Sequence, residues 1–146
     1  MGVWGAGTFD SDFSRTFLAD FVYRWEQLIE ALLACETPGD SARYRCDLRL
    51  ETCEACLMPT VEVLLVVAER LDPDYLPEVA TAERWRAQYL DLFDREIGAL
   101  GTSPGFAEER RDVIEATFGR LLALLRARAS ELSRGEPAAA PDRPRD

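Results

Sequence analysis

Hydrophobic residues recur every three or four positions over residues 13–33, and this spacing predicts an amphipathic helix. Charged and polar residues fall largely on the opposite side. Asp10 or Asp12 can cap the start of this helix by accepting bonds from its unpaired N–H groups. The sequence Thr37-Pro38-Gly39-Asp40 is predicted to end it, because proline and glycine both break helices. The apolar positions are Phe13, Phe17, Leu18, Phe21, Val22, Trp25, Leu28, Ile29, Leu32 and Leu33.

The pattern changes over residues 42–50, where apolar and polar residues alternate. A period of two is typical of a half-buried strand. A single strand cannot satisfy its own backbone hydrogen bonds, so this one needs a partner, and the segment around Val3-Trp4 is the candidate. An irregular loop is the alternative interpretation. The apolar positions of the alternation are Ala42, Tyr44, Cys46, Leu48 and Leu50.

A second helix is predicted to begin at Thr52 or Met58 and to end at Leu71. Pro59 favours the later start, because proline fits best within the first turn of a helix. Additional valines widen the apolar face, which indicates a central helix that is buried on several sides. The apolar positions are Val61, Val63, Leu64, Leu65, Val66, Val67, Ala68 and Leu71.

Two more amphipathic helices are predicted, from about residue 81 to 100 and from about 106 to 132, with a turn at residues 101–105 between them. Four such helices with short connections predict a mainly α fold, a compact bundle. The apolar positions are Ala82, Trp85, Tyr89, Leu92, Phe93 and Ile97 in the third helix and Val113, Ile114, Phe118, Leu121, Leu122 and Leu125 in the fourth.

The length of 146 residues and the 47% of hydrophobic residues fit one domain, which we place at residues 1–134. Arg134-Gly135 is predicted to end the last helix. Residues 135–146 are rich in proline, alanine and charge, and we expect a disordered tail there.

The formal net charge of −10 argues against nucleic acid and anionic membrane surfaces as partners, because both attract clustered cations. It suits a cytoplasmic protein or one that binds a basic partner. The N-terminus has no secretory leader, and no apolar run is long enough to span a bilayer. We therefore expect a cytoplasmic protein whose cysteines are mostly reduced.

All basic residues are arginines, and the chain contains no lysine or histidine. Without histidine, the usual general base and the commonest metal ligand are missing. Without lysine, Schiff-base chemistry and a P-loop are impossible. The sequence also contains no nucleophile elbow and no dinucleotide fingerprint. These absences exclude several large classes of enzyme.

The opening residues 2–12 combine three glycines with two large aromatics directly before the first helix. One interpretation is a folded plug, in which the aromatics enter one end of the bundle and the glycines take tight conformations. Another is a ligand or partner pocket with the two aspartates as polar anchors. Acid–base catalysis by those aspartates is a third, although helix capping already explains both. The candidate binding residues are Trp4, Gly5, Gly7, Phe9, Asp10 and Asp12.

The sequence Trp4-Gly5-x-Gly7-x-Phe9-Asp10-Ser11-Asp12 resembles the N-terminal signature of the bacterial family called domain of unknown function 4259. The family commonly has asparagine where this chain has Ser11. Its second helix is often alanine-rich with a glutamate, which Thr60-Val61-Glu62 matches only loosely. The specific likeness covers about twelve residues, and it implies a mostly helical fold without implying an activity.

The four cysteines leave three interpretations open. Two of them have the C-x-x-C spacing of metal or redox sites. Zinc held by four thiolates is one hypothesis, although such sites usually show two close pairs. A redox or regulatory disulfide is the second, and unpaired thiols that behave as small hydrophobes are the third. The residues are Cys35, Cys46, Cys53 and Cys56.

Glu62 lies among valines and leucines in the middle of the predicted second helix. A partly buried carboxylate there needs an arginine partner or a raised pKa. A salt bridge is our first interpretation, exposure to solvent the second and a functional acid the third.

The strong negative charge without a coherent catalytic set favours a non-enzymatic protein-interaction module, comparable to immunity or adaptor proteins, with a basic protein as its partner. A metal- or redox-responsive protein that uses the cysteines is the alternative hypothesis. A carboxylate-dependent enzyme comes third, and it needs Asp10, Asp12 and Glu62 in one pocket.

Overall fold

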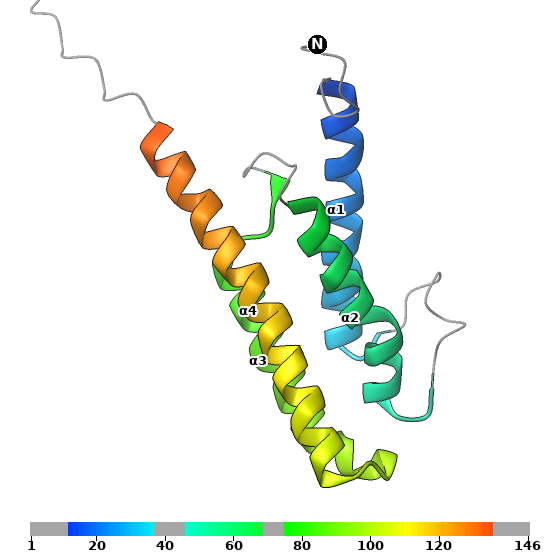
Figure 1. The fold of residues 1–146 in the computed structure, drawn as a ribbon. Coiled ribbons are helices and arrows are strands. Elements are labelled where there is room, and N and C mark those ends of the chain that lie inside the picture. The colour runs from blue at the N-terminus through cyan, green and yellow to red at the C-terminus, as the bar shows by residue number, and fades with distance from the viewer. Residues whose placement is uncertain (1–11, 37–45, 69–74, 136–146) are drawn as a thin grey trace, which may run out of the picture.

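The computed structural model describes residues 12–36, 46–68 and 75–135, and these form a bundle of four α-helices (Figure 1). Successive helices run in opposite directions, and the described residues contain no strand. The predicted mainly α bundle is therefore confirmed. The elements are α1 at Asp12–Leu33, α2 at Arg49–Ala68, α3 at Val79–Glu96, the 3-10 helix η3 at Ile97–Leu100 and α4 at Pro104–Gly135.

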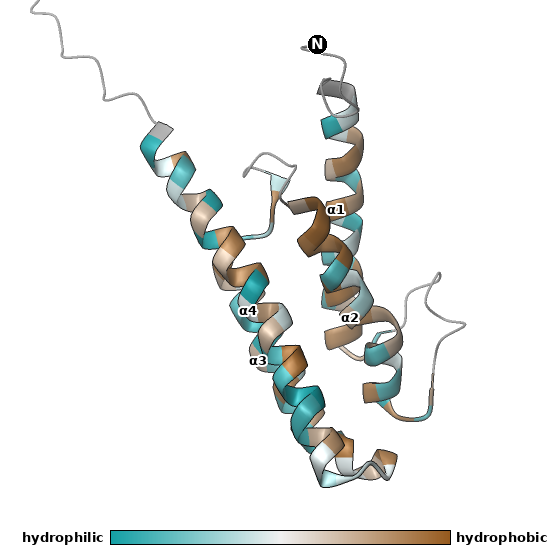
Figure 2. Cartoon of the chain, viewed as in Figure 1, coloured by the Kyte–Doolittle hydropathy of each residue, from teal (hydrophilic) through white to brown (hydrophobic). Residues whose placement is uncertain are grey.

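The helices pack as two antiparallel pairs, α1 with α2 and α3 with α4, and α2 contacts all three of the other helices. Figure 2 shows why α2 takes this position: it is the most hydrophobic of the four. α3 also contacts the three other helices, and two of the valines expected to widen the buried face of α2, Val63 and Val66, are exposed. The prediction of a second helix buried on several sides is therefore confirmed only in part. Apolar surface on several sides of one helix is stabilised only if other helices cover those sides.

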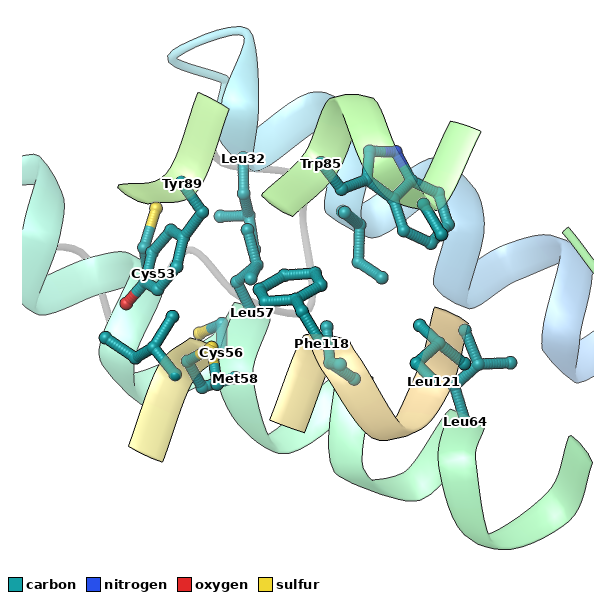
Figure 3. Close-up of a cluster of buried hydrophobic side chains, with 14 of the residues drawn as sticks. Leu32, Cys53, Cys56, Leu57, Met58, Leu64, Trp85, Tyr89, Phe118 and Leu121 are labelled. Carbon is teal, nitrogen blue, oxygen red and sulfur yellow. The ribbon is translucent and has the colours of Figure 1, made fainter. Parts of the chain in front are cut away.

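One hydrophobic core joins side chains from all four helices (Figure 3). Its largest members are aromatic residues of α3 and α4, with Tyr89 and Phe118 in contact at a ring-centre distance of 6.3 Å. Leucines of α1, α2 and α4 fill the space around these rings. The largest fully buried side chains are Trp85, Tyr89, Phe93, Phe118, Ile29, Leu32, Leu50, Leu57, Leu64, Leu92 and Ile114.

The predicted strand at 42–50 is wrong over its described part, because residues 46–48 are irregular and α2 begins at Arg49. Residues 42–45 lie outside the described part of the chain. The expected later start of the second helix at Met58 is also wrong. Pro59 stands in the middle of α2, where its side chain is exposed. The helix tolerates the missing N–H there because Ala55, whose carbonyl loses its partner, faces solvent.

The start of α2 is stabilised from a distant part of the chain. The backbone N–H of Leu50 donates to Glu96 Oε2 of α3 over 2.8 Å. A carboxylate at a helix N-terminus satisfies an unpaired N–H and interacts favourably with the helix dipole. Leu50 itself is fully buried, which adds the hydrophobic contribution. These tertiary contacts override the local alternation that predicts a strand.

The turn before α4 is confirmed. Gly101 has a left-handed backbone conformation with φ of 66°, which glycine adopts without steric cost. Ser103 then caps α4, because its Oγ accepts from the N–H of Phe106 over 3.2 Å. Pro104 occupies the first position of the helix, where its missing N–H costs nothing.

Four positions predicted to face the core are exposed instead. Phe17 and Val66 expose 66% of their surface, and Val63 and Val113 expose 45% and 44%. Each lies on the correct helix but at the edge of its apolar face. Spacing alone gives the direction of a side chain on its helix, whereas burial also requires a neighbouring helix on that side.

Candidate functional site

The predicted N-terminal site lies almost entirely outside the described residues. Asp12 is the first residue of α1, and nothing further is described of its side chain. The plug and the pocket therefore both stay predictions. The remaining residues of that site are Trp4, Gly5, Gly7, Phe9 and Asp10, and all lie before the described part.

A cavity with a volume of about 370 Å³ lies where α1 ends and α2 begins. Three of the four cysteines line it, together with two carboxylates and one arginine. The sequence did not predict this grouping, because the cysteines belong to different elements. The lining residues are Leu32, Cys35, Glu36, Cys46, Asp47, Arg49, Thr52 and Cys53.

The end of α1 places Cys35 at this cavity. Cys35 has a φ of 65°, a left-handed conformation that favours glycine. The following N–H, of Glu36, donates back to the carbonyl of Ala31 over 2.8 Å. This bond reaches across the last turn in the manner of a Schellman motif. Because the turn is closed by backbone bonds, the position of Cys35 follows from the end of the helix.

The start of α2 places the other residues of the cavity. The N–H of Cys46 donates to Thr52 Oγ1 over 3.0 Å, which folds the chain before α2 against its first turn. Arg49 Nη2 donates to the carbonyls of Leu32, over 3.3 Å, and Leu33. A guanidinium at the C-terminus of α1 satisfies unpaired carbonyls and complements the helix dipole. The junction of the two helices is thus fixed by side-chain contacts.

The four cysteines differ in exposure. Cys35 and Cys46 are exposed, whereas Cys53 and Cys56 are buried. Burial raises the pKa of the Cys53 thiol to about 11, and Arg49 offsets only part of this effect. Burial and the charge of Cys46 also raise the pKa of Cys56. The two buried groups therefore stay protonated thiols at neutral pH.

Among the described residues, which include all four cysteines, no group of three or more cysteines or carboxylates is placed to hold a metal ion. The zinc hypothesis therefore receives no support from this arrangement. The C-x-x-C spacing lies within α2, where Cys53 and Cys56 are one turn apart and both face the core.

A second polar cluster joins α2, α3 and α4. The hydroxyl of Tyr89 donates to Glu54 Oε1, and Arg110 donates to Glu54 Oε2 from Nε over 2.8 Å. Burial, followed by the negative charge of Glu54, raises the pKa of the Tyr89 phenol, which stays neutral. Glu54 is therefore a structural acceptor for donors of two other helices.

Glu62 lines a shallow groove of about 190 Å³ between α2 and α4, together with Glu54. Its Oε1 accepts from Thr117 Oγ1 over 3.0 Å and from Arg120 Nη2 over 2.9 Å. The predicted salt bridge is confirmed. Both carboxylates of this groove are thus bound by donors of the protein.

Sequence reasoning missed the residues that organise these two sites. Arg49 and Glu96 act on the ends of helices that are distant in sequence, and Glu54 lies within the C-x-x-C segment. No local pattern signals any of the three.

No helix within the described ranges is long and apolar enough to cross a bilayer. Comparison with protein-family models, curated proteins and solved structures finds no match to this chain. The likeness to domain of unknown function 4259 therefore rests on residues 4–12 alone and stays a prediction.

Proposed function

We propose that this protein is a non-enzymatic interaction module of the immunity or adaptor type, whose acidic surface binds a basic protein. The net charge of −10 supports a cationic partner. The observation that carries the proposal is that carboxylates of the same chain bind most of the described arginines. The carboxylates that are not paired with an arginine leave the surface negatively charged.

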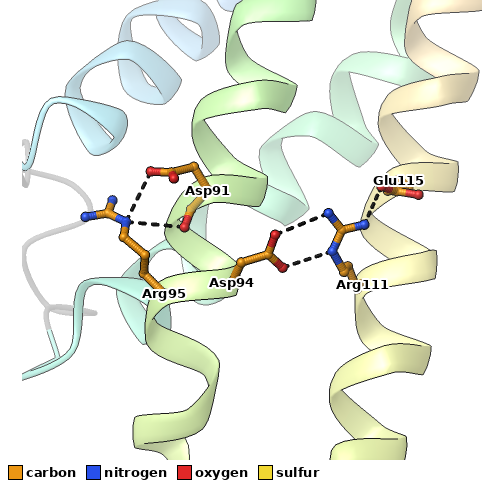
Figure 4. A network of polar contacts seen from close by, with 5 residues as sticks. All are labelled: Asp91, Asp94, Arg95, Arg111 and Glu115. Carbon is orange, nitrogen blue, oxygen red and sulfur yellow. Dashed lines mark hydrogen bonds and ion pairs between the residues drawn. The ribbon is translucent and has the colours of Figure 1, made fainter.

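The contact between α3 and α4 illustrates this use of arginine (Figure 4). Arg111 donates from Nε to Asp94 Oδ1 over 2.9 Å and from Nη2 to Oδ2 over 3.2 Å, and it also binds Glu115. The hydrogen bonds that Arg111 donates to Asp94 and Glu115 raise the pKa of its guanidinium. Other pairs of this kind are Arg84–Glu30, Arg95–Asp91, Arg110–Glu54, Arg120–Glu62, Arg126–Glu83 and Arg128–Glu131.

Three exposed carboxylates at the junction of α1 and α2 make no ion pair within the described residues. Glu36 and Asp47 line the cavity, and Glu51 lies in the first turn of α2. Glu36 also follows the C-terminus of α1, where the helix dipole is negative. Negative charge that is not neutralised within a protein attracts cationic partners and speeds their association. This junction is therefore the first surface to test.

The test is an affinity capture with the full chain at low ionic strength, with partners identified by mass spectrometry. The test variant carries Glu36→Gln, Asp47→Asn and Glu51→Gln. The control carries Glu108→Gln, Glu109→Gln and Asp112→Asn, an equal change of charge on exposed positions of α4. The proposal predicts a basic protein that is released by salt, lost with the test variant and retained by the control.

An unrelated acidic protein of similar size and charge serves as the background. If the wild-type chain captures nothing beyond this background, or if both variants lose the captured protein equally, the proposal is wrong. The enzyme hypothesis is independent of this experiment, because it needs Glu62 in one pocket with Asp10 and Asp12. Since Arg120 and Thr117 bind Glu62, nothing in the described residues favours it.

A further inference from the structure

The cavity at the junction of α1 and α2 holds an arrangement that the proposed interaction does not use. Three cysteines are among the residues that line it, Cys35, Cys46 and Cys53. All four cysteines of the chain are present as thiols. Cysteines from separate elements that line one cavity can react with one another by thiol–disulfide exchange.

Solvent can reach only part of this group. Cys35 and Cys46 are exposed, whereas the exposed fraction is 0% for Cys53 and 8% for Cys56. Thiol–disulfide exchange requires a thiolate that an oxidant can approach. Burial keeps Cys53 and Cys56 both protonated and covered. The two exposed cysteines are therefore the ones that can begin an exchange reaction.

Contacts on both sides hold the two exposed cysteines at the same junction. Cys35 follows the carbonyl of Leu33 by two residues, and Cys46 precedes Arg49 by three. Arg49 binds that carbonyl directly, so one contact joins the two short segments. The backbone of Cys46 is additionally held by Thr52. These contacts keep the two segments together whether or not a covalent bond joins them.

We propose that Cys35 and Cys46 form a reversible disulfide at the rim of this cavity, which makes the α1–α2 junction a redox-sensitive modification site. The oxidant belongs to the class of small disulfides, such as glutathione disulfide. The bond closes a ring of the chain from residue 35 to residue 46. It joins the end of α1 covalently to the segment that precedes α2.

The reaction proceeds in two exchange steps. One exposed thiolate attacks a sulfur of the small disulfide, forms a mixed disulfide and expels one small thiolate. The other exposed thiolate then attacks the cysteine sulfur of that mixed disulfide and expels the second small thiolate. The two cysteines lose two electrons and two protons in total. The small disulfide gains the electrons, and the two released thiolates take up the protons.

The experiment uses the full chain in mixtures of reduced and oxidised glutathione, followed by alkylation and intact mass measurement. Trypsin cuts after arginine, so Cys35, Cys46 and the two buried cysteines fall on separate peptides, residues 25–43, 46–49 and 50–70. The proposal predicts a species lighter by two hydrogens, in which the first two peptides are linked. It also predicts that Cys35→Ser or Cys46→Ser abolishes the link.

Three outcomes would overturn the proposal: a link from residues 46–49 to residues 50–70, glutathione adducts on Cys35 and Cys46 without a link between them, or no oxidation. These readouts need only the wild-type chain, so they hold even if a variant fails to fold. Cys56→Ala is the matched control, and the link should persist in it.

A thermal measurement tests the effect on the junction. A disulfide that closes a short ring removes conformations from the unfolded chain, so the unfolding midpoint should rise by roughly 5–10 °C on oxidation. Dithiothreitol should reverse the shift, and the double variant Cys35→Ser, Cys46→Ser should not show it. An unchanged midpoint in the linked protein would contradict the assignment of a stabilising link to this junction.

Discussion

Two helices of this protein, α1 and α3, carry aromatic residues four positions apart, yet the two rows differ in what surrounds them. Trp85, Tyr89 and Phe93 of α3 expose 1% of their surface or less. On α1, Phe17 exposes 66%, and its ring is stacked edge-on against Phe21 at a ring-centre distance of 5.0 Å. Phe21 is half-buried, and Trp25 is partly buried and packs against the core. The row of α1 therefore leaves the core toward the start of the helix, whereas all three rings of α3 lie within the core.

The difference comes from the neighbouring helices and from polar partners. In α3, Trp85 Nε1 donates to Glu30 Oε1 over 2.7 Å, and the hydroxyl of Tyr89 donates to Glu54. Aromatic residues with polar atoms are buried at low cost when those atoms find acceptors. Figure 1 shows α1 and α4 diverging toward the start of α1. Equal spacing thus gives a fully buried row on α3 and, on α1, a row that ends in the exposed ring of Phe17.

The largest expected effect is the replacement of a ring on the buried side. Trp85→Ala should lower the free energy of unfolding by about 3–5 kcal/mol, because it removes a fully buried ring and leaves a cavity. Phe17→Ala is the matched control, and it should cost less than about 1 kcal/mol. Urea unfolding followed by circular dichroism measures both. Equal losses would show that the aromatic row of α1 is also packed in solution.

The second largest loss of stability is expected at Glu54, which accepts the hydrogen bond of the Tyr89 hydroxyl. Glu54→Ala leaves the phenol and Arg110 without their carboxylate, and it should cost about 2–3 kcal/mol, because both donors are largely shielded from water. Glu62→Ala removes a carboxylate from the same groove whose side chain is 47% exposed, so its cost should stay below about 1 kcal/mol. A reversed order in urea unfolding would refute this ranking.

A smaller effect is expected at the start of α2. Glu96→Gln removes the charge that faces the N–H of Leu50 and should cost about 1 kcal/mol. The amides of the first turn of α2 should then exchange with deuterium faster. Glu78, at the start of α3, makes no capping bond through its side chain, so Glu78→Gln is the control. Equal exchange in both variants would show that Glu96 does not cap α2.

The smallest effect concerns Glu26, beside the aromatic row of α1. Burial, followed by the charge of Glu30, raises the pKa of Glu26. The folded state then binds this proton more tightly than the unfolded state, so the contribution of Glu26 to stability is lost as pH rises through its folded-state pKa. Glu26→Gln should therefore stabilise the protein at neutral pH, by less than about 1 kcal/mol, and should have no effect in acid.

The control is Asp20→Asn, an exposed carboxylate of the same helix. Urea midpoints measured between acidic and neutral pH provide the comparison. A gain in stability for Glu26→Gln that is the same at every pH would contradict the titration and point to packing instead.

Helical spacing was sufficient to predict the order and approximate bounds of the four helices. It failed at the start of α2, because the groups that stabilise Leu50 there come from α3, 46 residues away in the sequence. Pro59 misled the prediction for a related reason. A proline costs less within a helix when the carbonyl it leaves unpaired faces water, and exposure of that side could not be inferred before packing was known.

The candidate site was less predictable than the fold. The sequence shows four cysteines but not which of them share a cavity, because that depends on the contact between α1 and α2. Arg49 makes this contact with backbone carbonyls, which carry no signal in the side-chain sequence. The predicted salt bridge of Glu62 is present, but its side chain is 47% exposed, so burial does not make the arginine obligatory as the sequence argument supposed.

The position of Glu54 has a consequence for the alignment of the helices along their axes. Its two oxygens are bound by donors from α3 and α4. This one carboxylate of α2 therefore fixes the positions of three helices relative to one another along their axes. If α3 or α4 slid by one turn, about 5.4 Å, apolar side chains would still meet apolar side chains, but a donor would lose its acceptor. Apolar contacts alone do not fix the alignment along the axes, whereas this polar contact distinguishes the native alignment from its shifted alternatives.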